Sequence, residues 1–219
     1  MRLNLLLIEK YNRLQSSFLM ILSLLFIIVM LINPSSLTYY FQYYLLLITV
    51  TIIGIPHGFF DYSIAERLFD NNKNWTYYFT IGYILLSLIY LTVWFLLPLI
   101  ALIFFLIISI FHFGIEEQSH LEYEDMKLFQ TFMIGSMPIF LPILFHTFDV
   151  FNIFNQIIDI NITSMSININ IYYLYFLLLF IALYHNGIKR SMIYLLLIIN
   201  FIILPPLISF ILFFCFHHS

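Results

Sequence analysis

The stretch from Pro98 to Ile115, PLIALIFFLIISIFHFGI, decides the fold of this chain. It contains no acidic residue, lysine or arginine, and a helix needs about 20 apolar residues to cross the hydrocarbon core of a bilayer. Near its end lies His112. An ionisable side chain is unfavourable in lipid and by default marks a functional site. The stretch therefore predicts a membrane-spanning helix that ends in a functional residue.

The composition of the whole chain agrees with a membrane protein. Hydrophobic residues make up 63% of the sequence, aromatic residues 20% and charged residues only 9%, whereas a soluble domain carries about 25% charged residues. The excess of apolar residues must face lipid, and helices are the elements that satisfy their own backbone there. We therefore expect one integral membrane domain over residues 1–219, multi-pass in the cell membrane. The net charge of −3 indicates no nucleic-acid partner.

Eight apolar segments are candidates for membrane spans. They cover residues 17–33, 38–58, 76–96, 98–115, 129–146, 170–185, 191–204 and 205–218. The last three are short, and only the helix-breaking pair Pro205-Pro206 separates the last two. The predicted fold class is an all-α, polytopic membrane bundle with seven to eight transmembrane helices.

The basic residues predict the orientation of the bundle. All eight lysines and arginines precede the first span or follow the second, fourth and sixth spans. Cytoplasmic loops carry such an excess of basic residues, so both termini are predicted to be cytoplasmic. The acidic segment 116–128 would lie on the same side and is predicted to be a solvated loop. Segment 147–169 would lie outside, where an interfacial segment is one interpretation.

Histidines recur at the ends of the spans that run toward the cytoplasm. Four of them lie at comparable depth: His57, His112, His185 and His218. Imidazole is the commonest protein ligand for transition metals, and facing helices of a bundle can hold a metal ion. Asp61 and Glu116 follow two of these histidines at i+4, the spacing that places both groups on one helix face. Such carboxylates could accept the second ring N–H of a metal-bound histidine.

Each histidine also has an ordinary interpretation as an interfacial residue bonded to backbone or lipid headgroup. His120 lies in the acidic segment and is expected to be solvated, and His146 lies at the outer end of its span. His185 could cap its helix. His217 and His218 are adjacent, and adjacent helical residues point about 100° apart, so we expect at most one of them to be a ligand.

Four short motifs follow one another from about residue 54 to the end. They are Gly54-Ile55-Pro56-His57-Gly58 with Asp61, Phe111-His112-Phe113-Gly114, the segment 135–146 and the segment 205–219. They resemble the PHGxxD, HFG, GxxPIxLPxLFH and PPLxxF…FCxxHS motifs of the Brp/Blh family of β-carotene 15,15′-dioxygenases. Each is short, but four in family order within one polytopic chain are a specific resemblance.

The resemblance implies a membrane enzyme that cleaves β-carotene at its central double bond with O₂ and releases two retinal molecules. It implies Fe(2+) held by His57, His112 and His218, with no catalytic residue beyond the ligands. Asp61 and Glu116 would support the ligand histidines, and aromatic residues would line a channel for the polyene. The family commonly supplies retinal to a microbial rhodopsin.

Two points stay open at this stage. The family pattern continues with a histidine four positions beyond His218, so either the chain is C-terminally truncated or this ligand is missing or replaced. His185 would replace it only if its span faces the site. The alternative function is a membrane transporter or channel that uses intramembrane histidine and aspartate for ion or proton coupling.

Overall fold

The computed structural model describes residues 2–54, 62, 65–66, 74–118, 127–160, 162, 167–184 and 188–218. All regular elements in these residues are helical, which confirms the all-α prediction. In chain order they are α1 (Arg2–Ile32), the 3-10 turn η1 (Pro34–Ser36), α2 (Tyr39–Thr49), the π-helical turn η2 (Val50–Gly54), α4 (Trp75–Leu96), α5 (Pro98–Gln118), α6 (Lys127–Phe145), α7 (Thr147–Ile158), α8 (Ile169–Leu183), α9 (Ile188–Ile203) and α10 (Pro206–Phe216).

Each of the eight predicted segments coincides with a helix. Pro98 begins α5 and Pro205 caps α10, so the prolines separate the helices as predicted. Helix α1 begins at Arg2, well before residue 17, and α5 extends one turn beyond residue 115. Within the described part of the chain, four helices are long and apolar enough to cross a membrane by length and composition: α1 from Leu14, α4, α5 and α6. The total of seven to eight spans stays a prediction.

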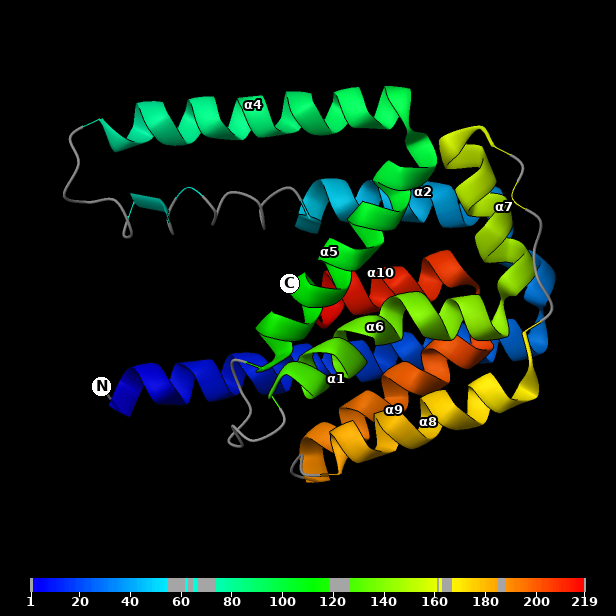
Figure 1. The fold of residues 1–219 in the computed structure, drawn as a ribbon. Coiled ribbons are helices and arrows are strands. Elements are labelled where there is room, and N and C mark those ends of the chain that lie inside the picture. Colours follow the sequence, from blue (N-terminus) through cyan, green and yellow to red (C-terminus); the bar gives the residue numbers. More distant parts are fainter. Residues whose placement is uncertain are drawn as a thin grey trace.

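Helix α10 lies inside the bundle and α4 lies at its edge. In Figure 1, α10 lies centrally between α2 and α6, whereas α4 runs across the top of the molecule. Helix α10 contacts α1, α2, α6 and α9, and α5 is the main neighbour of α4. No residue of α4 is buried, while most of α10 is. The core of the bundle therefore forms around α10 and α6.

Two glycines allow α5 and α6 to pack more extensively than any other described pair of helices. A Cβ atom added to Gly114 would overlap the carbonyl of Thr131, and one added to Gly135 would overlap the carbonyl of Ile110. Small residues permit this close approach of helix backbones in membranes. The crossing fixes the end of α5 beside the first half of α6.

The structure resolves part of the predicted outer segment 147–169. Residues 147–158 form helix α7, and its side chains bind α2. Tyr39 donates to Asp149, and the Tyr43 hydroxyl donates to Gln156 Oε1 at 2.8 Å. The segment therefore contains a helix that packs on the bundle.

The helix ends that adjoin basic residues lie on one side of the molecule. In Figure 1, the start of α1, the end of α5, the end of α8 with the start of α9, and the end of α10 all lie toward the left of the bundle. Basic residues occur in or next to the first three of these ends, including Lys127 at the start of α6 and the pair Lys189-Arg190 in α9. The orientation itself, with both termini cytoplasmic, stays a prediction.

Candidate metal centre

The candidate site forms where α5 and α10 end on the same side of the bundle. His112 and Glu116 lie in the last two turns of α5, and their i+4 spacing places both on one face. Helix α10 ends at Phe216, and the backbone N–H of His218 still donates to the carbonyl of Phe213 at 2.9 Å. This last bond folds the chain end back over its helix, so that His218 faces α5.

Three ligand atoms converge at this point. The Nε2 atom of His218 lies 3.4 Å from Nε2 of His112 and 3.0 Å from Oε2 of Glu116. All three atoms lie within 4.8 Å of one another. His218 is buried and His112 is exposed, so the cluster lies at the boundary between the interior of the bundle and its surface. Two imidazoles and a carboxylate form a donor set that suits a divalent transition metal ion.

Aromatic rings enclose the buried histidine of this set. Phe113 meets the His218 ring edge-on, with centroids 4.7 Å apart, and Phe213 stacks on it at 5.9 Å and 14°. Phe214 lies at 6.3 Å. These rings restrict the orientation of the imidazole and give it an apolar surrounding, which controls solvent access to a metal site.

A second histidine–carboxylate pair, His217 with Glu117, lies directly beside the pair of His218 and Glu116. Nε2 of His217 lies 2.9 Å from Oε1 of Glu117, and the Tyr194 hydroxyl donates to Oε2 of the same carboxylate at 2.9 Å. The Glu117 side chain is only 13% exposed. The prediction of a solvated loop from residue 116 was therefore wrong here, because α5 continues and α9 covers it. In the sequence, the adjacent residues Glu116-Glu117 and the adjacent residues His217-His218 were the signal that two histidine–carboxylate pairs form.

The structure brings together only part of the predicted ligand set. His112 and His218 meet, with Glu116 beside them. His57, Asp61, His120 and His185 lie outside the described residues. The described chain that precedes His57 ends at Gly54 in η2, which contacts α10.

His146 lies far from the metal cluster. Gly114 of α5 faces Thr131 of α6, and His146 follows Thr131 by fifteen residues, one residue beyond the end of α6. At 1.5 Å per residue this is about 22 Å. His146 is therefore at the other end of the bundle, as the sequence predicted.

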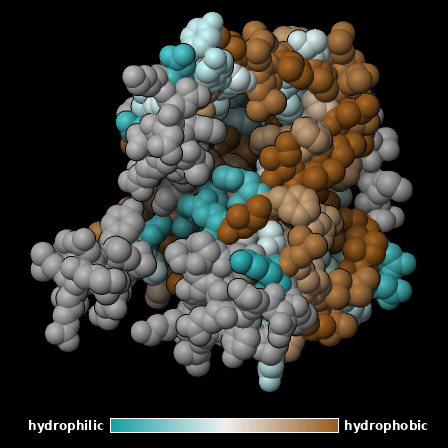
Figure 2. Space-filling model, turned by 60° about the vertical axis from the view of Figure 1, so that its left-hand side comes forward, coloured by the Kyte–Doolittle hydropathy of each residue, from teal (hydrophilic) through white to brown (hydrophobic). Residues whose placement is uncertain are grey.

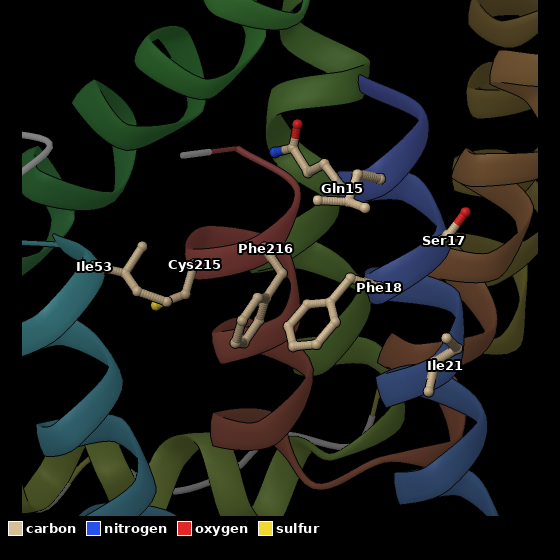
Figure 3. A pocket seen from close by; sticks show the side chains of 8 residues that line it. Gln15, Ser17, Phe18, Ile21, Ile53, Cys215 and Phe216 are labelled. Atoms are coloured by element: carbon tan, nitrogen blue, oxygen red, sulfur yellow. The ribbon is translucent and has the colours of Figure 1, made fainter. Parts of the chain in front are cut away.

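An apolar groove runs along α10 on the side of α1. It has a volume of about 450 Å³ and is lined mainly by apolar side chains of α1, η2 and α10. Figure 3 shows the rings of Phe18 and Phe216 side by side, and Ile53 and Cys215 pointing toward each other from neighbouring helices. The centroids of the two rings are 5.5 Å apart. The groove begins next to the chain segments that lead to His57 and His218.

The surface around this end of the bundle is not uniformly apolar. Figure 2 brings forward the left-hand side of Figure 1, and hydrophilic residues gather near the centre of this view, with hydrophobic surface to their right. Elsewhere the exposed surface is rich in large apolar side chains, as in α4. A local polar site within an apolar surface is typical of a functional site in a membrane protein.

Comparison with known proteins agrees with the resemblance carried by the motifs. The family model described as Beta-carotene 15,15′-dioxygenase matches residues 48–219. A protein named Beta-carotene 15,15′-dioxygenase from Uncultured marine bacterium 66A03 is 28% identical over 199 residues, which cover 79% of this chain and 65% of that protein. The chain thus spans just under two thirds of this relative's length. No solved structure matches the chain. On the strength of the family match, the chain belongs to the β-carotene 15,15′-dioxygenase family.

Proposed function

We propose that this protein cleaves β-carotene at its central double bond with O₂. The double bond breaks and each of its carbons takes one oxygen atom as a carbonyl, so that one β-carotene and one O₂ give two molecules of retinal. Membership of the family supports the reaction. The observation that carries the proposal is the convergence of His112, His218 and Glu116 at the ends of two helices.

We propose Fe(2+) as the ion that these residues hold. Two histidines and one carboxylate with open positions are the ligand set of many non-haem iron oxygenases. When bound, iron would supply the redox chemistry that activates O₂. His57 remains a proposed third histidine ligand. Its support is that η2, which ends three residues before it, packs against α10, the helix that presents His218.

The geometry favours a direct role for Glu116 over a supporting one. A supporting carboxylate binds the ring nitrogen that faces away from the metal. Glu116 instead approaches Nε2 of His218, the same nitrogen that faces Nε2 of His112. We therefore propose Glu116 as a ligand, and we keep Asp61 as the carboxylate that supports His57.

We propose that the groove of Figure 3 receives part of the polyene. β-Carotene is a methyl-substituted conjugated hydrocarbon with ring ends, so its binding site needs apolar contact and shape. Phe18 and Phe216 provide aromatic surface, and the groove is bounded by α1 and η2. Because the site lies among apolar helices, we propose that the substrate enters from the bilayer of a cell membrane in which the protein is multi-pass.

Retinal formation in cells that produce β-carotene tests the proposal. His112→Ala and His218→Ala should each abolish retinal formation at unchanged protein level, because each removes a metal ligand. His146→Ala is the matched control, because it removes a histidine about 22 Å along the bundle, and it should retain retinal formation. Unchanged retinal yield in the first two variants would contradict the proposal.

A further inference from the structure

The pair of Glu117 and His217 has no direct role in the proposed reaction, yet the Glu117 side chain is less exposed than that of Glu116. The Glu117 side chain is 13% exposed and the Glu116 side chain 41%. Both oxygens of Glu117 are engaged, one by His217 and the other by Tyr194. Tyr194 is 3% exposed and belongs to α9, a helix that contributes no atom to the three-atom metal cluster. A buried carboxylate with two partners needs an explanation.

Direct metal binding does not explain this pair. Adjacent residues of a helix point about 100° apart, so Glu116 and Glu117 face different neighbours. The converging ligand atoms belong to Glu116, His112 and His218. Both oxygens of Glu117 are directed at other side chains.

The end of α10 shows what the pair can do. His217 is the C-cap of α10, and His218 follows it beyond the last helical residue, so the helix itself does not fix the ligand. Contacts that hold this end include the bonds from the N–H groups of His217 and His218 to the Phe213 carbonyl, the contact of His217 with Glu117, and a bond from Gln15 Nε2 to the His217 carbonyl at 3.3 Å. The side chain of His217 is thus an anchor immediately before the ligand.

We propose that Glu117 is the positioning residue of the metal centre. Oriented by Tyr194, it anchors His217 and thereby sets the imidazole of His218 against His112 and Glu116. The anchor joins three helices, since Glu117 belongs to the end of α5, Tyr194 to α9, and His217 is the C-cap of α10. This inference rests on the proposed function in one respect, namely that the cluster binds a metal ion.

Substitutions in this anchor should weaken metal binding strongly, although they alter no metal ligand. Partners that orient metal ligands typically contribute about 10-fold to 100-fold in affinity. Tyr194→Phe removes one hydroxyl and should weaken binding about 10-fold. Glu117→Ala removes the whole anchor and should weaken it by up to about 100-fold. Glu117→Gln still accepts from Tyr194 and can donate to His217, so it should recover most of the affinity.

Titration of the detergent-purified full chain with Co(II) tests the inference, because the visible absorption of this ion reports both affinity and ligand geometry. Tyr175→Phe is the matched control. Its hydroxyl lies 3.0 Å from Oγ of Ser136 and its side chain is 8% exposed, but it belongs to α8. This variant should lose stability as Tyr194→Phe does, with unchanged Co(II) affinity and spectrum.

The outcomes separate the positioning role from the proposed function. Weaker binding with an altered Co(II) spectrum in Tyr194→Phe, but not in Tyr175→Phe, supports the positioning role. Binding equal to wild type in both Tyr194→Phe and Glu117→Ala overturns it and leaves the proposed function standing. A wild-type protein that binds no Co(II) overturns the metal centre itself, and the inference with it.

Discussion

Helices α4 and α10 are both almost entirely apolar, but they occupy opposite environments. Helix α4 has 22 residues, none of them buried, and it lies at the edge of the bundle (Figure 1). Helix α10 has 11 residues, and eight of them are buried: Pro206, Leu207, Ile208, Ser209, Ile211, Leu212, Phe213 and Cys215. Apolar composition therefore predicts that a helix leaves water, but it does not predict whether the helix faces lipid or protein. The short helix leads directly to His218, one of the three residues of the candidate site.

Truncation of one phenylalanine in each helix is the strongest test of this contrast. Phe213 of α10 is 2% exposed and packs against Phe113, Phe201 and His218. Phe213→Ala should lower the free energy of unfolding by about 3–5 kcal/mol. Phe95 of α4 is 83% exposed, and Phe95→Ala should change the free energy of unfolding by less than about 0.5 kcal/mol. Reversible unfolding in mixed micelles measures both, and equal losses would show that α4 is packed in the folded protein.

Glycine substitutions give the next largest difference. Gly135→Ala would place a Cβ against the carbonyl of Ile110 and force α5 and α6 apart, at a cost of about 1–3 kcal/mol. Gly82 of α4 has no atom within 4 Å of an added Cβ. Gly82→Ala should therefore stabilise the protein by up to about 1 kcal/mol through helix propensity. Midpoints of thermal unfolding should move in opposite directions; a loss of stability in Gly82→Ala would place a neighbour against α4.

Serine substitutions should give the smallest difference. Inside the bundle, Ser23 of α1 accepts a bond from Asn200 Nδ2 at 2.8 Å, and both residues are fully buried. Ser23→Ala should cost about 1 kcal/mol, as interhelical hydrogen bonds in membranes do. The hydroxyl of Ser87 in α4 bonds only within its own helix among the contacts described, to Tyr83 at 2.9 Å. Ser87→Ala should leave the unfolding midpoint unchanged, and a loss equal to that of Ser23→Ala would contradict the contrast.

Much of the fold could be predicted because apolar runs and prolines carry the information locally. Each predicted segment coincides with a helix, and Pro98 and Pro205 separate neighbours. The start of α1 could not be predicted in this way, because its first residues mix charged, polar and apolar side chains. Helix α7 was missed as a helix because its residues are only partly apolar and it is stabilised by contacts with α2, which are distant in sequence.

The candidate site could be predicted in part. Depth in the bilayer placed His112 and His218 near each other, and the structure brings their Nε2 atoms to 3.4 Å. The distance between Glu116 and His218 could not be predicted, because it depends on how α10 ends. The Glu117–Tyr194 contact was also beyond prediction, since it depends on α9 packing across residues that a sequence assigns to a loop.

The iron content of the purified protein tests the central claim most directly. The account predicts close to one iron ion per chain in the wild-type protein, and loss of iron in a variant that combines His112→Ala with His218→Ala. His146→Ala should retain the metal, because it alters a histidine at the other end of the bundle. A wild-type protein without iron, or a double variant that keeps it at the wild-type level, would contradict the account.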